Sequence, residues 1–303
     1  MGLIRYHLGI GGWEHETFDD CFYPRAGYSS LQKLTYYSTF FSSVEVRATF
    51  WDESLSSSDA RGWSEAVSGN GEFLFLVKLH SLFTHRREFR PGATRNTRGI
   101  LQELARHNRL GGLLMQFPYS FTNTSSNRFH LTKLAELFRG FPLFVELRHA
   151  SWNQRGLPGL LQDVGLSPVN ADLPRMQQYM PFFTRTVGDT AYLRLHGRNE
   201  KGWLANDMDA RYDYLYNSRE LIELKRRVEN LSRHCSRVIV TFNNTTGGKA
   251  IPNGLCLTTH LRGGKQLVLP AASLSSFPHL QEIGSPDAEE LSLFSGGTYR
   301  RAM

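Results

Sequence analysis

The chain contains few cysteines, three in 303 residues, and they stand far apart. They are Cys21, Cys235 and Cys256, and no two of them form a C-x-x-C pair. This number and spacing exclude a disulfide framework and a cysteine-based zinc cluster. Unpaired cysteines fit a reducing compartment, so we expect a cytoplasmic protein.

Long apolar runs are missing as well. No stretch approaches the roughly 20 residues that a helix needs to cross a bilayer. The first ten residues include Arg5 and His7 and lack the apolar region of a secretory signal. We therefore expect no membrane segment, in agreement with a cytoplasmic location.

Motifs for cofactors and nucleophiles are also absent. The run Gly9-Ile10-Gly11-Gly12-Trp13 is not the G-x-G-x-x-G of a dinucleotide site. We expect it to form a tight turn that sets Trp13 over the functional site. No G-x-S-x-G elbow occurs, and no cysteine ends a predicted strand. The sequence therefore predicts no nucleotide cofactor.

Basic residues outnumber acidic ones in this chain. There are 35 lysines and arginines against 28 aspartates and glutamates, which gives a formal net charge of +7. The isoelectric point is near 9.4. Such a balance favours anionic partners, either phosphate compounds or nucleic acid. The hydrophobic content of 40% is ordinary for a globular protein and is enough for a sizeable core.

Apolar runs typical of strands alternate with runs of helical period. The strand candidates are Tyr6–Gly11, Ser43–Phe50, Phe73–His80, Gly112–Phe117, Leu143–Arg148, Leu166–Ala171, Ala191–His196 and Arg237–Phe242. Eight strands in alternation with helices predict an α/β protein, a TIM-type (β/α)8 barrel. We expect residues 1–262 to form this single domain. Residues 263–303, rich in Ser, Gly and Pro towards the end, are expected to form a partly flexible C-terminal extension.

Hydroxyl side chains mark the expected starts of several helices. Ser125 or Ser126 and Thr94 each precede a run with apolar residues at helical spacing. Ser218 is the expected cap of another helix. We expect no full capping box there, because Leu221 stands where Glu or Gln would be.

Charged and amide residues occupy alternate positions near the ends of several predicted strands. Side chains two apart share a face of a strand, and in a barrel the strand ends converge at the C-terminal mouth. The residues are Glu45, Arg47, Lys78, His80, Glu146, Arg148, Arg194, His196 and Asn243. Asp172, Arg198 and Asn244 follow strands closely, and we expect them at the same mouth. An ion pair that fills the interior would explain any one of these residues, but the whole set favours a functional site.

These residue types predict an enzyme that acts on a small anionic, phosphorylated substrate by acid–base chemistry. The candidate catalytic residues are Glu45, Lys78, Glu146 and His196, whose side chains can move protons. The candidate substrate-binding residues are Trp13, Arg47, His80, Arg148, Asp172, Arg194, Arg198, Asn243 and Asn244. The arginines among them offer planar donors that suit phosphate or carboxylate. The pattern does not distinguish a hydrolase from an isomerase or lyase, and it does not define the oligomeric state.

Two alternatives accompany this hypothesis. A divalent metal could lie among Glu45, Glu146, Asp172, His80 and His196, although no compact H-x-H or H-E-x-x-H spacing supports it. The protein could instead bind nucleic acid or act as a phosphodiesterase. The predicted loop from residue 81 to residue 98 holds five arginines, and exposed aromatic side chains suit stacking on bases.

The same segments resemble the family called domain of unknown function 72, the YecE-like family, over most of residues 6 to 260. Its pieces include Gly11-Gly12-Trp13, Val44-Glu45-Val46, Val77-Lys78, Val145-Glu146-Leu147-Arg148-His149 and Arg194-Leu195-His196-Gly197-Arg198. The resemblance implies a TIM barrel of the broad group that contains xylose isomerase and endonuclease IV, and it implies no particular reaction. The histidine-rich metal cluster of endonuclease IV is not matched. The family usually has Asn where Arg47 stands, so we expect a more cationic mouth in this chain.

Overall fold

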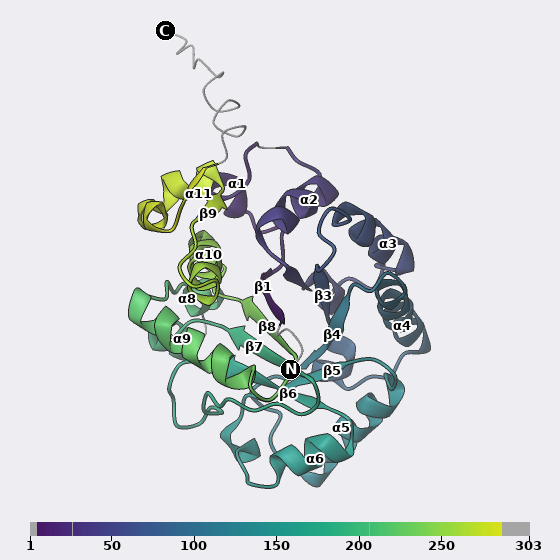
Figure 1. The fold of residues 1–303 in the computed structure, drawn as a ribbon. Coiled ribbons are helices and arrows are strands. Elements are labelled where there is room, and N and C mark those ends of the chain that lie inside the picture. Colours follow the sequence, from purple (N-terminus) through teal and green to yellow (C-terminus); the bar gives the residue numbers. More distant parts are fainter. Residues whose placement is uncertain (1–4, 26, 206, 287–303) are drawn as a thin grey trace.

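Eight parallel strands close a barrel in the computed structural model, which describes residues 5–25, 27–205 and 207–286. The strands are β1 (Arg5–Gly11), β2 (Ser43–Val46), β3 (Leu74–Lys78), β4 (Leu110–Gln116), β5 (Leu143–Glu146), β6 (Ser167–Asp172), β7 (Thr190–Leu195) and β8 (Arg237–Phe242). Each strand pairs with the next, and β8 pairs with β1 to close the ring (Figure 1). The predicted (β/α)8 barrel is confirmed.

Helices surround the barrel, as Figure 1 shows most clearly for α2 to α6 and for α9 and α10. The helices are α1 (Phe18–Cys21), α2 (Ser30–Phe40), α3 (Ser57–Ala66), α4 (Pro91–Arg106), α5 (Ser125–Leu137), α6 (Leu157–Asp163), α7 (Glu200–Leu204), α8 (Met208–Tyr212), α9 (Ser218–Leu231), α10 (Ala250–Leu261) and α11 (Ala271–Ser276).

The starts of α4, α5 and α9 differ from the sequence expectation. Helix α5 begins at Ser125, but Thr124 rather than Ser125 or Ser126 caps it, and the Thr124 hydroxyl accepts from the backbone N–H of Asn127. Helix α4 begins at Pro91 rather than after Thr94, because proline already has the φ that a first helical residue needs. Asn217, not Ser218, caps α9. Its side chain and that of Glu220 form a reciprocal capping box, so the prediction that the box is absent was wrong.

Side chains alternate between the barrel interior and the layer of helices. The interior holds an apolar cluster of Leu74, Leu76, Leu114, Phe144, Val169, Tyr192 and Ile239. Neighbouring positions such as Val77 and Val145 belong instead to the larger core that the strands share with the helices. The apolar cluster fills the middle of the barrel, so the polar side chains that follow on the same face are left at the C-terminal mouth.

Strand β2 ends at Val46, earlier than the predicted end at Phe50. Residues Ala48–Phe50 form a 3-10 turn instead. The hydroxyl of Thr49 lies 2.9 Å from the carbonyl oxygen of Val46 and 2.7 Å from that of Lys78, which ties the turn to the end of β3. Side chains beyond these points no longer follow the strand alternation.

The described part of the C-terminal extension packs beside the barrel. Strands β9 (Leu267–Leu269) and β10 (Gly284–Pro286) pair in parallel, and α11 lies next to α1 (Figure 1). The hydroxyl of Ser273 donates to the carbonyl of Cys21 at 2.7 Å. Residues 287–303, the rest of the segment predicted to be partly flexible, lie outside the described residues.

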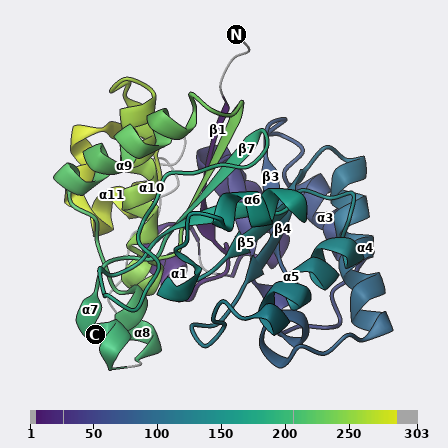
Figure 2. The same ribbon diagram turned by 90° about the horizontal axis from the view of Figure 1, so that it is seen from below.

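The two ends of the barrel differ in what covers them. Figure 2 shows the start of β1 towards one end and α7 and α8 at the other, beyond the C-terminal ends of the strands. The segment between β7 and α9 therefore builds part of the mouth. Within the described ranges, no helix combines the length and the apolar character that a membrane span requires.

Candidate functional site

A cavity of about 590 Å³ opens at the C-terminal mouth of the barrel. Its charged lining is entirely basic, because no aspartate or glutamate of the described residues lines it. The basic residues are Arg47, Lys78, Arg148, Arg194 and Arg211. Asn243 and several aromatic side chains form much of the remaining wall. Five of the predicted site residues thus meet at one cavity: Arg47, Lys78, Arg148, Arg194 and Asn243.

Beneath this cavity, Glu45 and Glu146 share one guanidinium group. Arg194 donates from Nε and Nη2 to the two oxygens of Glu45 at 2.8 and 2.9 Å, and from Nη1 to Oε2 of Glu146. Arg148 donates from Nε to Oε1 of Glu146 at 2.8 Å. Tyr192 donates its hydroxyl to Glu45 at 3.0 Å. Every oxygen of the two buried carboxylates therefore accepts at least one hydrogen bond.

The same network sets the charge of the two glutamates. Burial would raise the pKa of Glu45, but Arg194 and Lys78 lower it overall. At Glu146 burial is again outweighed, and Arg194 and His196 hold the pKa well below its usual range. Both groups are ionised at neutral pH and act as counter-ions to arginines, so proton transfer in the cavity requires another group.

His196 is neutral and completely buried under the same network. Burial lowers its pKa to about 4, against the raising effect of Glu146. The amide nitrogen of Asn243 lies 3.1 Å from Nδ1, so Nδ1 accepts and Nε2 carries the proton. Nε2 then donates to Glu146 at 3.3 Å. The imidazole links Asn243 in the cavity wall to the ion pairs below.

Lys78 lines the cavity and has no carboxylate partner among the described residues. Its Nζ lies 4.0 Å above the ring of Phe50, and no hydrogen bond or ion pair of Nζ occurs among the described residues. Burial, followed by the charge of Arg194, lowers the pKa of Lys78 to about 7 even though Glu45 acts in the opposite direction. The amine is therefore substantially neutral near physiological pH.

Asp172 and Arg198 pair with each other away from the mouth cavity. Arg198 donates from Nε to Oδ2 of Asp172 at 2.8 Å and from Nη1 to Glu220 at 3.0 Å. Tyr216 donates its hydroxyl to the same oxygen of Asp172 at 2.9 Å. Gly197, with a φ of 86°, turns the chain just after β7, so Arg198 leaves the interior face on which Arg194 and His196 lie.

His80 and Asn244 are also directed away from this cavity. His80 lines a small pocket between β3 and α4, and its Nδ1 accepts from the backbone N–H of Leu82 at 3.1 Å. The amide nitrogen of Asn244 donates to the carbonyl of Tyr214 at 2.7 Å and to Oδ1 of Asn253 at 3.0 Å. Asn244 therefore fixes the segment before α9, and the expected place of both residues in the mouth is not observed.

Trp13 does not cover the mouth cavity, contrary to our expectation. Its ring is buried edge-on against Trp63 at a centroid distance of 6.0 Å, and Nε1 lies 3.1 Å from the carbonyl oxygen of Ser30. It lines a smaller neighbouring cavity of about 270 Å³. Arg47 lines both cavities, and the exposed Trp51 stands at the rim that they share.

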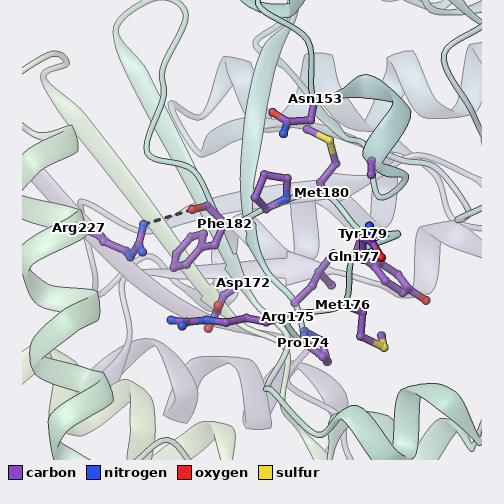
Figure 3. Close-up of a pocket in the computed structure, with 13 residues that line it drawn as sticks. Asn153, Asp172, Pro174, Arg175, Met176, Gln177, Tyr179, Met180, Phe182 and Arg227 are labelled. Carbon is purple, nitrogen blue, oxygen red and sulfur yellow. Dashed lines mark hydrogen bonds between the residues drawn. The ribbon is translucent and has the colours of Figure 1, made fainter.

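A second cavity of similar size, about 600 Å³, lies beside the first and shares Tyr179 with it. Figure 3 shows Phe182 and Arg227 on one side of it and Met176 and Tyr179 on the other. Asp172 lines this second cavity, and burial raises the pKa of its carboxyl despite the pairing with Arg198. The sequence placed Asp172 at a functional mouth, whereas the structure places it in this adjoining space.

Several residues of the mouth cavity come from loops and were not predicted. Tyr119, Tyr179, Arg211 and Tyr212 line it, and the guanidinium of Arg211 lies 4.7 Å above the ring of Trp203. Three of these five come from the long connection between β7 and α9. The length of that connection was a usable signal, because loops that follow barrel strands lie on the catalytic face.

The proposed metal ligands are not gathered at one place. Among residues 5–25, 27–205 and 207–286, no three His, Cys, Asp or Glu side chains are grouped so that they could hold a metal ion. Asp172 and His80 lie in other pockets, and the carboxylates of Glu45 and Glu146 already bind arginines. This donor set offers no site for a divalent cation in the mouth.

Comparisons with known proteins agree with this architecture. The family model described as "Protein of unknown function DUF72" matches residues 7–276, which extends beyond the boundary expected at residue 262. The UPF0759 protein YunF of Bacillus subtilis is 29% identical over 268 residues, which are 82% of this chain and 92% of that protein.

Two solved structures are similar to this one. A DUF72 family protein of Thermotoga maritima has a TM-score of 0.74 and 30% identity, over 85% of this chain and 99% of that chain. A DUF72 family protein of Enterococcus faecalis also has a TM-score of 0.74, with 26% identity over 85% of this chain and 96% of that one. With a family model that covers most of its length, this chain belongs to the DUF72 family.

Proposed function

We propose that this protein is an enzyme that binds a small anionic substrate in the mouth cavity and transforms it by acid–base chemistry. The observation that carries the proposal is the lining of the cavity, which contains five basic side chains and no carboxylate of the described residues. Arg148 and Arg194 pair with glutamates beneath the cavity. Arg47 and Lys78 form no ion pair with a carboxylate among the described residues, and burying such cations is unfavourable unless a ligand supplies the negative charge. A phosphate or carboxylate group is a ligand of that kind.

Arg148 and Arg47 are the residues best placed to bind the anion. Only Nε of Arg148 is hydrogen-bonded to Glu146, and its two terminal nitrogens have no partner among the described residues. The recorded hydrogen bond of Arg47 is a long one, 3.3 Å from Nη1 to the carbonyl of Gly11. Arg194 has a different role, since three of its donors already bind carboxylates. Lys78 is the group with a pKa suited to proton transfer.

The proposal is tested by titrating the protein with inorganic phosphate and measuring binding by calorimetry and by the shift in Tm. Arg148→Met should weaken phosphate binding by roughly 10- to 100-fold, the loss expected for a charge-assisted contact. Arg47→Met provides a second variant if Arg148→Met unfolds. Arg139→Met changes an exposed arginine outside the cavity and should bind as the wild type does. Equal phosphate affinity in all four proteins, or none in any, would contradict the proposal.

Binding of nucleic acid is a second candidate with narrower support. The exposed Trp51 at the rim of a basic cavity suits stacking on a base. The segment that carries five arginines is largely helical, and three of them have partners within the chain. Arg87 lies over Phe121, Arg90 binds Glu88 and Arg98 donates to the carbonyl of Leu137. An oligonucleotide affinity that falls steeply with salt concentration would favour this candidate, and its absence at low salt would remove it.

A further inference from the structure

Lys78 is the lysine of the mouth cavity, and its surroundings are unusual for a lysine. Its side chain leaves the end of β3 on the interior face, lies over the ring of Phe50 and lines a cavity that four arginines also line. Glu45 is a nearby negative group, but both of its oxygens are held by Arg194. Solvation and a counter-ion, the two factors that normally keep a lysine charged, are therefore both reduced.

Other lysines of the chain show what Lys78 lacks. Three of them form ion pairs with carboxylates: Lys33 with Asp19, Lys225 with Glu229 and Lys249 with Asp213. Lys133 is the informative comparison, because it also lies over a phenylalanine ring, that of Phe129, at 4.7 Å. Lys133 and Phe129 are exposed. Both lysines therefore contact an aromatic ring, but only Lys78 of the two lies in a cavity.

The chemical consequence concerns nucleophilicity. A protonated lysine has no lone pair, whereas a neutral amine attacks electrophilic carbon. Burial and the charges of Arg194, Arg148 and Arg47 lower the pKa of Lys78 to about 7, so the reactive form is abundant near neutral pH. The neighbouring arginines that favour the neutral amine also bind anions, which links the nucleophile to the kind of substrate that can reach it.

We propose that Lys78 forms an imine with the carbonyl group of an anionic oxo compound that Arg148 and Arg47 hold in the mouth cavity. The substrate class is an aldehyde or ketone that carries a carboxylate or a phosphate close to the carbonyl carbon. This inference rests on the proposed function, because it requires that the cavity binds anions.

Imine formation passes through a carbinolamine and conserves atoms and electrons. The lone pair of Nζ forms a bond to the carbonyl carbon, and the π electrons of the C=O bond move to oxygen. A proton passes from the nitrogen to that oxygen and gives a carbinolamine. A second proton, taken from solvent, allows the hydroxyl group to leave as water while the nitrogen lone pair forms the C=N bond. The product is a protonated imine, and no oxidant or reductant is involved.

A protonated imine withdraws electrons from the neighbouring carbon and weakens its bonds to hydrogen and carbon. That chemistry is typical of isomerases and lyases, and it gives hydrolysis no advantage. Of the reaction classes that the sequence left undistinguished, the inference therefore favours isomerase or lyase chemistry over hydrolysis.

The experiment uses reductive trapping on the whole protein. Glyoxylate and dihydroxyacetone phosphate serve as carboxylate-bearing and phosphate-bearing probes, and propionaldehyde serves as the neutral one. Sodium cyanoborohydride reduces any imine to a stable amine, and peptide mass spectrometry measures the modified fraction of each lysine. We expect Lys78 to be trapped about 10- to 100-fold faster than Lys133, because far more of its amine is neutral. The rate at Lys78 should rise with pH through about 7 and fall when phosphate is added.

The outcomes separate this inference from the proposed function. Trapping at Lys78 no faster than at Lys133, in a protein that binds phosphate, overturns the imine and leaves anion binding intact. Failure of phosphate binding overturns the proposed function itself. A ratio of trapping at Lys78 to trapping at Lys133 that is the same for propionaldehyde as for the two anions overturns the role of the arginines in delivering the substrate. Arg148→Met should slow trapping by the anionic probes more than trapping by propionaldehyde, which loses only the effect of Arg148 on the pKa of Lys78.

Discussion

Glu45 at the end of β2 and Arg194 on β7 face each other across the barrel interior. They form a two-point ion pair, with Nε and Nη2 of the arginine 2.8 and 2.9 Å from the two carboxylate oxygens. Both side chains are almost completely excluded from solvent. The pair lies beneath the mouth cavity and neutralises the arginine that the sequence suggested as an anion clamp. Buried carboxylate–arginine pairs therefore lie below, and a cavity lined by basic side chains, with no aspartate or glutamate of the described residues in its lining, lies above them.

Breaking this pair should cost much of the stability of the protein. Glu45→Gln leaves part of the positive charge of Arg194 uncompensated in the interior, and we expect the free energy of unfolding to fall by about 3–5 kcal/mol. Urea denaturation measures this change. The matched control is Glu72→Gln, which breaks the exposed pair with Arg5 and should cost only about 0–1 kcal/mol. Similar losses in the two variants would show that the buried pair has no special role.

The neutral state of His196 predicts a loss of stability in acid. Its pKa is about 4 in the folded protein and 6.5 as the ordinary value. Between these values the unfolded chain binds a proton that the folded protein does not, so this contribution is present above about pH 6.5 and is lost as the pH falls towards about 4. Between about pH 7 and pH 5 the loss from this one group is on the order of 2 kcal/mol.

His196→Gln isolates that contribution. The variant is expected to be less stable at neutral pH, but its stability should fall less steeply on acidification than that of the wild type. His234→Gln changes an exposed histidine and should keep the wild-type slope. Chemical denaturation at several pH values provides the comparison. Parallel pH profiles for wild type and His196→Gln would mean that folding does not lower the pKa of His196.

The barrel could be predicted from the sequence because its strands follow one simple rule. Strands that are buried on both faces are apolar at nearly every position and recur between helical segments, as Val44 to Val46 and Val238 to Phe242 illustrate. The same rule identified Lys78, Glu146 and Arg194, which stand inside strands on the interior face. Their placement required only the two-residue period of a strand.

The predictions failed where the strand ended earlier than its alternation implied. His80 follows the end of β3 and turns towards α4, and Arg198 follows the left-handed Gly197 and turns towards Asp172. Asp172 failed for another reason: β6 runs one residue further than predicted, to Asp172, and the alternation from the interior residue Val169 places Asp172 on the outer face. Tyr212 lies in the short helix α8 of the connection between β7 and α9, and the length of that connection was the signal that the sequence offered for it.

Lys78 should reduce stability at neutral pH. Its pKa is about 7 in the folded protein and 10.5 as the ordinary value, so the unfolded chain holds a proton that the folded protein releases. The contribution of the group to stability is therefore full above about pH 10.5 and is lost as the pH falls towards about 7, by up to about 5 kcal/mol. We expect Lys78→Met to raise the free energy of unfolding at neutral pH by about 2 kcal/mol or more. The wild-type lysine would then lower the stability of the protein in order to serve its function.

Lys133→Met is the control for this prediction, because it removes an exposed lysine that also lies over an aromatic ring. Its effect should stay within about 0.5 kcal/mol. Denaturant melts at neutral pH measure both variants. A Lys78→Met protein less stable than the wild type would show that the amine is charged and well paired in the folded state.

Gly11→Ala tests how closely the end of β1 approaches the cavity wall. A methyl group at this position would overlap Oδ1 of Asn243 and would lie 3.4 Å from Cδ of Arg47. Displacement of Asn243 removes its hydrogen bond to His196, and we expect a loss of about 1–3 kcal/mol in the free energy of unfolding together with weaker phosphate binding. Gly69→Ala places a methyl group where no atom lies within 4 Å, and it should change stability by less than about 0.5 kcal/mol. If Gly11→Ala bound phosphate and unfolded as Gly69→Ala does, Asn243 and Arg47 would not be held in place by the end of β1.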